Sequence, residues 1–275
     1  MPEPAVDVIQ VLDTPVGVGD LPDALLSAGI HAFTTEDAAR AAGISPASAR
    51  PALARLIHKR LIFSPARGLY IPIPPEYRSW GAVPAPWFVD SLLRHLNRRY
   101  YVGFLSAAEH HGAAHQRPQA FQVVVDRHLS DRSFGRVRLR FLTNHNAPQL
   151  PTEEANSPTG RMVVATPELT ALDLADRPHD GGGLDNVATI IADLVRTDKL
   201  RPIELADAAA HFPASAARRA GWLIEHFSDL RCDLLAGRAA DAIAQPSNLD
   251  PFAPRHGPLD PRWHLRINTD VEPEL

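Results

Sequence analysis

Residues 34–72 read TTEDAARAAGISPASARPALARLIHKRLIFSPARGLYIP, and this stretch decides the fold of the N-terminal part of the chain. Thr34 or Thr35 can cap a short helix whose first turn is acidic, and Gly43 can take the left-handed conformation that ends it. Ser45 caps a second helix that opens with a proline, where the missing N–H costs nothing. The stretch therefore predicts two helices joined by a tight turn.

The second helix carries an apolar stripe, and two short strands follow it. The stripe consists of Ala49, Leu53, Leu56, Ile57 and Leu61. This spacing is typical of a helix face packed on a small core, onto which Ile44 should also point. Residues 61–63 and 69–71 predict strands around a turn rich in Pro and Gly. With a short helix ending at Gly29, the order predicts a winged helix-turn-helix. Pro51 does not fit, because it should kink the second helix unless that helix starts later.

Charge along this stretch favours duplex DNA as a partner. From Ala38 to Arg67 there are six Lys or Arg residues and no Asp or Glu. A basic helix that fits the major groove, beside a hairpin with an arginine at its tip, suits double-stranded DNA. The predicted DNA-binding residues are Thr35, Ser45, Ala47, Ser48, Arg50, Arg55, His58, Lys59 and Arg67. The alternative is a module that only packs or dimerises, with its charges on an ordinary solvated face.

The composition of the 275 residues is that of a globular protein, with 45% hydrophobic and 22% charged residues. Residues 1–140 hold 16 Lys/Arg and 12 Asp/Glu, a net charge of +4, whereas the remainder holds 12 and 20, a net charge of −8. A basic half that faces DNA, joined to an acidic half with another task, would explain this asymmetry.

The sequence also bears on the compartment. Cys232 is the only cysteine, so neither an intrachain disulfide nor a thiolate metal site can form. The N-terminal residues have no basic region and no apolar core, as a signal peptide would, and no run of about 20 apolar residues occurs. We therefore expect a cytoplasmic protein.

Proline-rich and apolar segments divide the chain. We predict a flexible leader at 1–19, a winged helix-turn-helix domain at 20–74, a stiff and extended linker at 75–86, and a C-terminal α/β domain at 87–275. Strands are predicted at 120–126, 135–142 and 161–166, with another near 263–267. Helices are predicted within 87–99, after Ser106, after Thr166, and at 184–195, 203–210 and 214–235. The fold class is mixed α+β, with a small sheet and several helices.

A basic strand could enlarge the DNA footprint. Along 135–142 arginines alternate with apolar residues, as in a half-buried strand with a basic outer face. The possible second basic surface consists of Arg127, Arg132, Arg136, Arg138 and Arg140. It could contact phosphates or an acidic partner, or it could be a solvated sheet face, and the sequence favours neither interpretation.

The cluster Glu109-His110-His111 with His115 invites interpretation as a metal site. Only His111 and His115 could share a helical face, and the H-E-x-x-H motif of zinc proteases is absent. Partly buried structural histidines are the favoured interpretation. No metal and no cofactor are expected.

A metal-dependent nuclease is a further alternative, because DNA binding would suit it. Asp126 ends a strand, but no Glu-x-Lys strand follows. Glu168 and Asp173 are spaced i, i+5 on one helix and do not face each other, so we expect a solvated acidic helix there. No local Ser-His-Asp or Cys-His motif occurs either. The sequence therefore predicts no catalytic residues and no enzyme.

Four motifs occur in order along the chain. They are R-G-L-Y-x-P at 67–72, Y-V-G-F-L-S-A-A-E-H-H-G-A at 101–113, Q-V-V-V at 122–125 and T-P-E-x-T-A-L-D-L at 166–174. In this order they resemble the AbiEi family, the antitoxins and transcriptional regulators of abortive-infection, type IV toxin–antitoxin systems. Tyr101, Gly103, Ser106, Ala107, Ala108, His111 and Gly112 match the second motif, which we interpret as packing of a helix closely against a sheet.

The resemblance implies a winged helix that binds inverted repeats at its own promoter and represses it. It also implies a C-terminal antitoxin domain and a neighbouring gene for a nucleotidyltransferase-like toxin. An alternative of another class is a protein-binding module that neutralises this toxin directly and does not bind DNA. Co-purification with the product of the neighbouring gene would distinguish the two.

Overall fold

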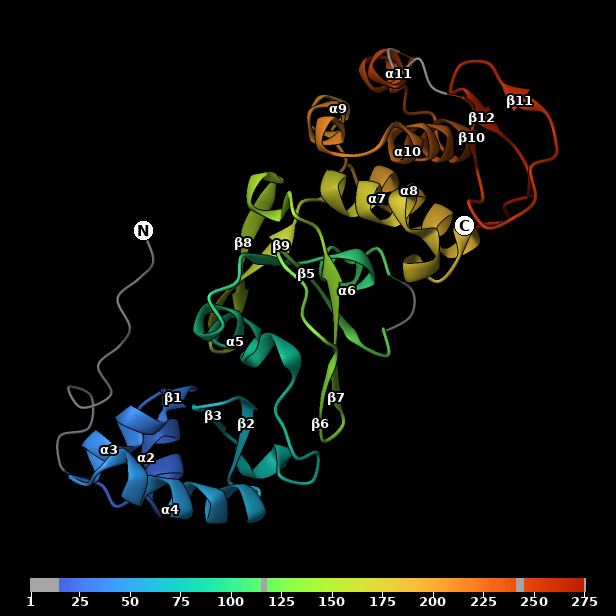
Figure 1. The fold of residues 1–275 in the computed structure, drawn as a ribbon. Coiled ribbons are helices and arrows are strands. Elements are labelled where there is room, and N and C mark those ends of the chain that lie inside the picture. The colour runs from blue at the N-terminus through green and yellow to red at the C-terminus, as the bar shows by residue number, and fades with distance from the viewer. Residues whose placement is uncertain (1–14, 115–117, 241–244, 275) are drawn as a thin grey trace. The chain divides into compact units, whose positions relative to one another are not determined.

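The structure is a computed structural model that describes residues 15–114, 118–240 and 245–274 (Figure 1). Its mixed α+β fold confirms the predicted class. The chain folds into two compact units. The N-terminal unit contains the chain up to Arg99 together with 129–140 and 155–162, and the C-terminal unit contains 100–128, 141–154 and the chain from Val163 onward.

The N-terminal module, residues 16–73, consists of three helices and a small sheet. Its elements are α2 (Leu21–Ser27), β1 (Phe33–Thr34), α3 (Thr35–Ala41), α4 (Pro46–His58), β2 (Ile62–Ala66) and β3 (Leu69–Pro72). The strands pair antiparallel in the order β1-β3-β2, and the helices, blue in Figure 1, pack beside them. The helices and the hairpin expected of a winged helix are all present.

Local chemistry explains where the helices of this module start and stop. The Thr34 hydroxyl accepts the N–H of Asp37, whose carboxylate in turn accepts the N–H of Thr34, so the two form a capping box. Gly43 ends this region with a positive φ of 64°. Ser45 caps α4 as predicted, and α4 runs on through Pro51. The missing N–H of Pro51 would otherwise bond the Ala47 carbonyl, and Ala47 is exposed, so water can solvate that carbonyl instead.

The core of this module begins before the predicted domain. Residues 1–14 of the predicted leader lie outside the described part of the chain. The Val16 N–H, however, donates to the Ala41 carbonyl at 3.0 Å, and Val18 is buried among α2, α3 and α4. The prediction of a loosely held leader is therefore wrong for this segment. Ile44, expected in the core, is also 42% exposed, because the chain turns outward after Gly43.

The predicted linker is not extended throughout. It contains the 3-10 turn η1 (Pro75–Tyr77), and η2 (Ala85–Trp87) begins at its end. Ala82 and Val83 between them are fully buried. The many prolines therefore shape a packed corner, because proline favours tight turns as well as extended backbone. The domain boundary at 75–86 stays a prediction.

A six-stranded sheet follows. It consists of β4 (Tyr100–Val102), β5 (Phe121–Val125), β6 (Arg132–Phe134), β7 (Val137–Thr143), β8 (Thr152–Ser157) and β9 (Gly160–Ala165), in the order β6-β7-β5-β4-β9-β8. β4 pairs antiparallel with β5 and parallel with β9. The sequence predicted β5, β7 and β9 as strands. It missed β6 and β8, which are the two edges of the sheet.

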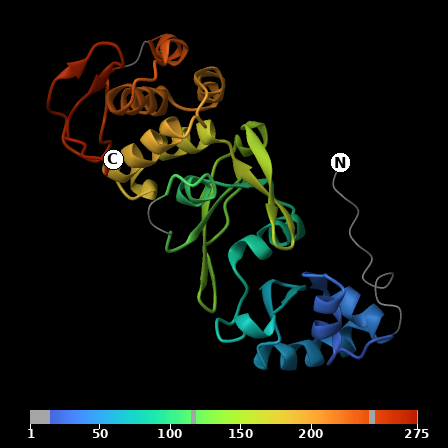
Figure 2. The same cartoon turned by 180° about the vertical axis from the view of Figure 1, so that it is seen from behind.

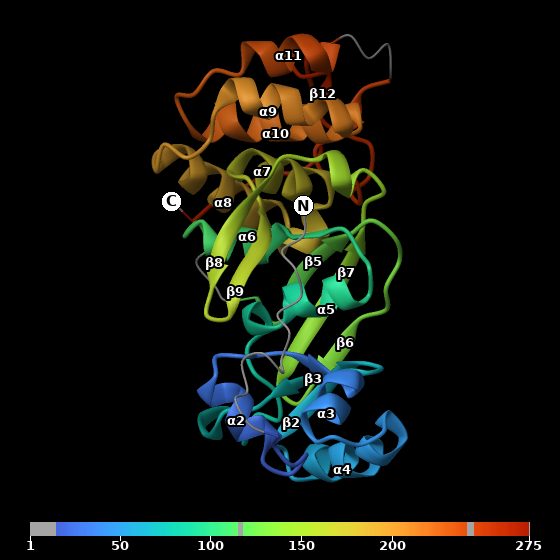
Figure 3. The same cartoon turned by 90° about the vertical axis from the view of Figure 1, so that its left-hand side faces the viewer.

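Helices surround α7 in the C-terminal unit. The helices outside the N-terminal module are α5 (Val89–His95), α6 (Phe104–His110), α7 (Pro167–Asp176), α8 (Leu184–Arg196), α9 (Pro202–Ala208), α10 (Ala214–Phe227) and α11 (Asp233–Ala240). α7 contacts α6, α8, α9 and α10, and its residues from Glu168 to Ala175 are buried. Figures 1 and 3 show α7 and α8 between the strand β5 and the layer of α9, α10 and α11.

Two helix predictions in this unit need correction. The predicted helix 214–235 is two helices, because α10 ends at Phe227 and α11 starts at Asp233. Ser106 does not cap α6, which begins after Gly103; the Ser106 hydroxyl instead accepts the backbone N–H of Gln122 at 2.9 Å. None of the described helices is long and apolar enough to cross a membrane.

A tryptophan helps to fix a small C-terminal sheet on α10. The sheet has strands β10 (Ser247–Asn248), β12 (Leu265–Arg266) and β11 (Leu259–Asp260), seen in red in Figure 2. Trp263 is 2% exposed, and its indole N–H donates to Glu225 of α10. Its ring lies on Gly221, where an added Cβ would come within 2.0 Å of the ring. Only glycine leaves room for this contact.

Replacing Gly221 by alanine should therefore destabilise the protein by about 1–3 kcal/mol, because the methyl group overpacks the Trp263 site. Gly237 is the matched control. It also lies in a helix, but nothing lies within 4 Å of its added Cβ, so Gly237→Ala should be neutral or slightly stabilising. Urea unfolding of both variants measures the difference. Equal stabilities would contradict the described packing.

Candidate functional site

Eight of the nine predicted DNA-binding residues are exposed. They are Ser45, Ala47, Ser48, Arg50, Arg55, His58, Lys59 and Arg67. α4 buries Ala49, Leu53 and Leu56 against the core. With 3.6 residues per turn, Ala47 and His58 face away from that row, whereas Ser48 and Arg50 lie on its two flanks. The exposed face of α4 thus carries small side chains near its start and basic side chains near its end.

Thr35 does not belong to this surface. It is 4% exposed, and its backbone N–H donates to the Gly68 carbonyl at 3.1 Å. It therefore joins the start of α3 to the wing, the hairpin formed by β2 and β3. The sequence could not show this, because the contact pairs residues that are far apart in the chain.

The tip of the wing presents Arg67. Ala66 pairs with Leu69, so Arg67 and Gly68 form a two-residue turn, in which Gly68 takes a positive φ of 81° that glycine adopts at no steric cost. The Arg67 carbonyl accepts a hydrogen bond from the His95 ring at 3.0 Å. The backbone of the tip is held in place while the guanidinium stays exposed.

The hairpin of β6 and β7 supports the wing within the same unit. The Arg132 guanidinium donates to the Pro65 carbonyl of β2. The ring of Phe134 lies 5.5 Å from that of Phe63. Burial lowers the pKa of Arg132. Arg132, predicted for the second basic surface, is therefore committed to an internal contact.

The other arginines of this predicted surface differ in exposure. Arg136 and Arg138 are exposed, Arg140 is half-buried, and Arg127 pairs with Asp126 at 3.5 Å. The alternation along β7 is as predicted, since Val137, Leu139 and Phe141 are buried. Arg136 and Arg138 are thus the members best placed to meet a ligand.

Glu168 and Asp173 of α7 are not solvated, contrary to the prediction. Glu168 is 5% exposed, and its carboxylate accepts the N–H of Arg201 at 2.8 Å. Asp173 is 3% exposed. Their burial follows from the neighbours of α7, which cover the helix on several sides. Both carboxylates thus serve internal packing.

Two of the sequence motifs meet at a buried pair. The Tyr101 hydroxyl donates to Asp173 Oδ1 at 3.1 Å. Burial raises the pKa of Asp173 well above its usual value, and burial together with the nearby Asp173 raises that of Tyr101. Gly103 lies against the pair, because an added Cβ would be 2.9 Å from Val124 and 3.1 Å from Asp173 Oδ2. The motif glycine therefore permits the close approach that we expected.

Gln122, which begins the Q-V-V-V motif, is tied to the second motif. Besides its backbone bond to Ser106, its side-chain oxygen accepts the Leu105 N–H and its amide donates to the Asp180 carbonyl, each at 2.8 Å. These bonds fix α6 on β5. The motifs thus mark contacts between elements of one domain.

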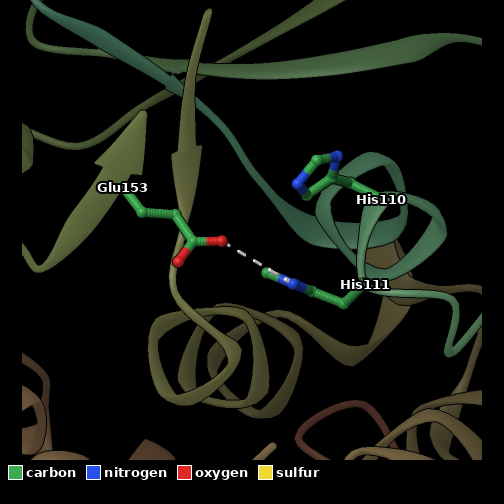
Figure 4. A group of neighbouring side chains, drawn as sticks. All are labelled: His110, His111 and Glu153. Carbon is green, nitrogen blue, oxygen red and sulfur yellow. Dashed lines mark ion pairs between the residues drawn. The ribbon is translucent and has the colours of Figure 1, made fainter. Parts of the chain in front are cut away.

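His111 connects the end of α6 to the strand β9. Its Nε2 lies 2.8 Å from the Ala165 carbonyl. His110 and Glu153 lie beside it, and the three side chains could offer ligand atoms that all lie within 4.8 Å of one another (Figure 4). Burial lowers the pKa of His111. His115, the other member of the predicted histidine cluster, lies outside the described residues.

Asp173 gives a testable dependence of stability on pH. Because its folded pKa is raised, the unfolded chain ionises it first, so its stabilising effect is full below about pH 4 and is lost as pH rises toward the folded pKa. Asp173→Asn cannot ionise. Above about pH 4 we expect the difference in unfolding free energy between the variant and the parent to shift in favour of the variant, by at most about 1.4 kcal/mol per pH unit.

Urea unfolding at several pH values measures this gain. Asp229→Asn, which removes an exposed carboxylate, is the control and should follow the parent. A parallel pH profile for Asp173→Asn and the parent would show that Asp173 ionises as readily in the folded state as in the unfolded state.

The fold of the chain was compared with those of known proteins. The fold is similar to the crystal structure of the RV2827C protein from Mycobacterium tuberculosis, with a TM-score of 0.66 over 92% of this chain and 91% of that chain, at 18% sequence identity. At this identity the likeness concerns the fold alone. A search of curated proteins found no match.

The family described as the AbiEi antitoxin C-terminal domain matches residues 101–226. This region holds the Tyr101–Asp173 pair and three of the four motifs that carried the resemblance. The resemblance is therefore confirmed over this region: residues 101–226 match the C-terminal domain of AbiEi antitoxins.

Proposed function

We propose that the protein is the antitoxin of a type IV toxin–antitoxin system and the repressor of its own promoter, acting in the cytoplasm. The observation that carries the proposal is the combination of two features in one chain. One is a module that exposes a basic helix and wing without acidic residues between Ala38 and Arg67. The other is an AbiEi antitoxin domain at 101–226.

In this proposal α4 enters the major groove of an inverted repeat. Arg55, His58 and Lys59 near its end, and Arg67 at the wing tip, contact phosphates, which supply most of the affinity. Ser48 and Arg50 lie near the start of the helix and read base edges, because arginine can pair with guanine through two hydrogen bonds. The contacts work as a set, since α4 and the wing belong to one packed module.

The second basic surface extends this footprint along the DNA backbone. Arg136 and Arg138 are exposed on β7, in the same compact unit as the wing. Their hairpin is fixed on the wing through Arg132 and Phe134. Phosphate contacts from this hairpin add affinity without adding sequence preference.

The C-terminal domain supplies the antitoxin activity, and its partner is a nucleotidyltransferase-like toxin. Residues 141–275 carry the net charge of −8, which would complement a basic partner surface. The domain acts by binding and needs neither a cofactor nor a catalytic residue of its own. The domain can oppose the toxin in two ways: it binds the toxin directly, or it counteracts the toxin's effect without contact.

Single alanine variants test the assignment of base and phosphate contacts. Arg50→Ala should weaken binding to the chain's own promoter roughly 10- to 100-fold and random DNA much less, because it removes a base contact. Lys59→Ala should weaken both alike. Gel-shift titrations measure the affinities, with the exposed Arg255→Ala as a control outside the module. An unchanged promoter affinity for Arg50→Ala would remove this assignment.

Salt dependence tests the second basic surface. Binding should weaken steeply as salt increases, and each lost phosphate contact should reduce the slope of log affinity against log salt by about 0.9. The double variant Arg136→Ala/Arg138→Ala should therefore flatten the slope and keep the preference for the promoter. A slope equal to that of the parent would show that these arginines do not contact DNA.

Toxin rescue separates the two proposed roles. A full-length chain with Arg50→Ala, Arg55→Ala and Lys59→Ala should lose repression of a promoter reporter but still protect cells that express the neighbouring toxin. Co-purification of the tagged variant with the toxin reports direct contact. Loss of protection by a folded variant would contradict the division of roles between the two parts of the chain.

A further inference from the structure

Three side chains from two elements converge at the end of α6. His110 is the last residue of that helix and His111 follows it, whereas Glu153 belongs to the edge strand β8. Figure 4 shows the Glu153 carboxylate pointing toward the ring of His111, with the ring of His110 beside them. We propose that these residues form a binding site for a divalent transition-metal ion, for which Zn²⁺ is the best fit.

The hydrogen bond of His111 prepares its other nitrogen for a metal. A carbonyl oxygen can only accept, so Nε2, 2.8 Å from the Ala165 carbonyl, carries the hydrogen. In the neutral ring Nδ1 then has a free lone pair, which faces Glu153 Oε1 at 3.9 Å. Metal-bound histidines typically donate their other N–H to a carbonyl or carboxylate in this way. Two electron-rich atoms facing each other without a shared hydrogen favour a cation between them.

The distances suit an ion after a small adjustment. The three ligand atoms lie within 4.8 Å of one another. In a tetrahedral zinc site, with bonds of about 2.0–2.2 Å, ligand atoms lie about 3.3 Å apart. His110 and Glu153 are exposed, so their side chains can rotate to close the gap. His111 is buried, and the Lys199 ammonium holds its backbone carbonyl, so it provides the fixed ligand.

The chemistry of the ligands selects the kind of ion. Two imidazole nitrogens and one carboxylate oxygen suit Zn²⁺, Co²⁺ or Ni²⁺, whereas Mg²⁺ and Ca²⁺ prefer oxygen ligands alone. Three protein ligands leave a fourth position open. The exposure of His110 and Glu153 places that position within reach of solvent or of a partner's side chain.

This inference does not rest on the proposed DNA or toxin binding. The three residues lie within 101–226, the region that matches the antitoxin domain, and none is a predicted DNA contact. An ion there would link α6 to β8 and stabilise the domain by mass action. Metal binding and thermal stability can therefore be measured on the protein alone.

Titration of the full-length, tag-free protein with Zn²⁺ tests the proposal, by calorimetry and by competition with a chromophoric chelator. We expect one tight site per chain, a rise in melting temperature with Zn²⁺, and no such effect of Mg²⁺. Glu153→Gln should weaken Zn²⁺ binding at least about 10- to 100-fold, the loss seen even when only a residue behind a ligand is changed. His110→Gln should act in the same direction.

Matched variants control for weak binding by surface groups. Glu154→Gln changes the next carboxylate of β8, and His128→Gln changes an exposed histidine outside the cluster. Both should bind Zn²⁺ like the parent. The proposal is overturned if the parent shows no site of one ion per chain, or if Glu153→Gln and Glu154→Gln bind Zn²⁺ equally. Circular dichroism confirms that each compared variant is folded.

Discussion

The enclosure of α7 is the constraint on which the C-terminal unit depends. α6, α8, α9 and α10 all contact this helix, and its residues from Glu168 to Ala175 are buried. A carboxylate in such a place must stay neutral or find donors, since an unpaired buried charge is costly. Asp173 meets this demand with a raised pKa and the hydroxyl of Tyr101. The motifs at 101–113 and 166–174 thus meet because the buried Asp173 needs a hydrogen-bond donor, which Tyr101 supplies.

Local patterns predicted much of the fold, and tertiary contacts account for what they missed. The caps at Thr34 and Ser45 depend on neighbours within four residues, so the sequence revealed them. The missed strands β6 and β8 are edges of the sheet, where polar residues are tolerated and periodicity is weak. The burial of Thr35 depends on Gly68, and no local pattern reports such a contact.

The candidate site was likewise predictable where it depends on local patterns and not where it depends on tertiary contacts. Exposure of the basic residues on α4 followed from the apolar stripe, because the buried row fixes the opposite face. The commitment of Arg132 to the wing did not follow, since alternation along a strand shows which face a residue occupies and not what lies above it. For the same reason Glu153 could not be placed beside His111, from which it is separated by several elements of the chain.

The discontinuity of the N-terminal unit has a consequence for biosynthesis. The wing is complete once Pro72 has been made, but the hairpin that holds Pro65 and Phe63 comes from 129–140, and the unit also includes 155–162. Domains tend to fold as units while the chain leaves the ribosome. Here the core of α2, α3 and α4 is formed by residues up to Tyr70, so these helices can pack early, whereas the wing gains its support from Arg132 and Phe134 only after that later hairpin has left the ribosome.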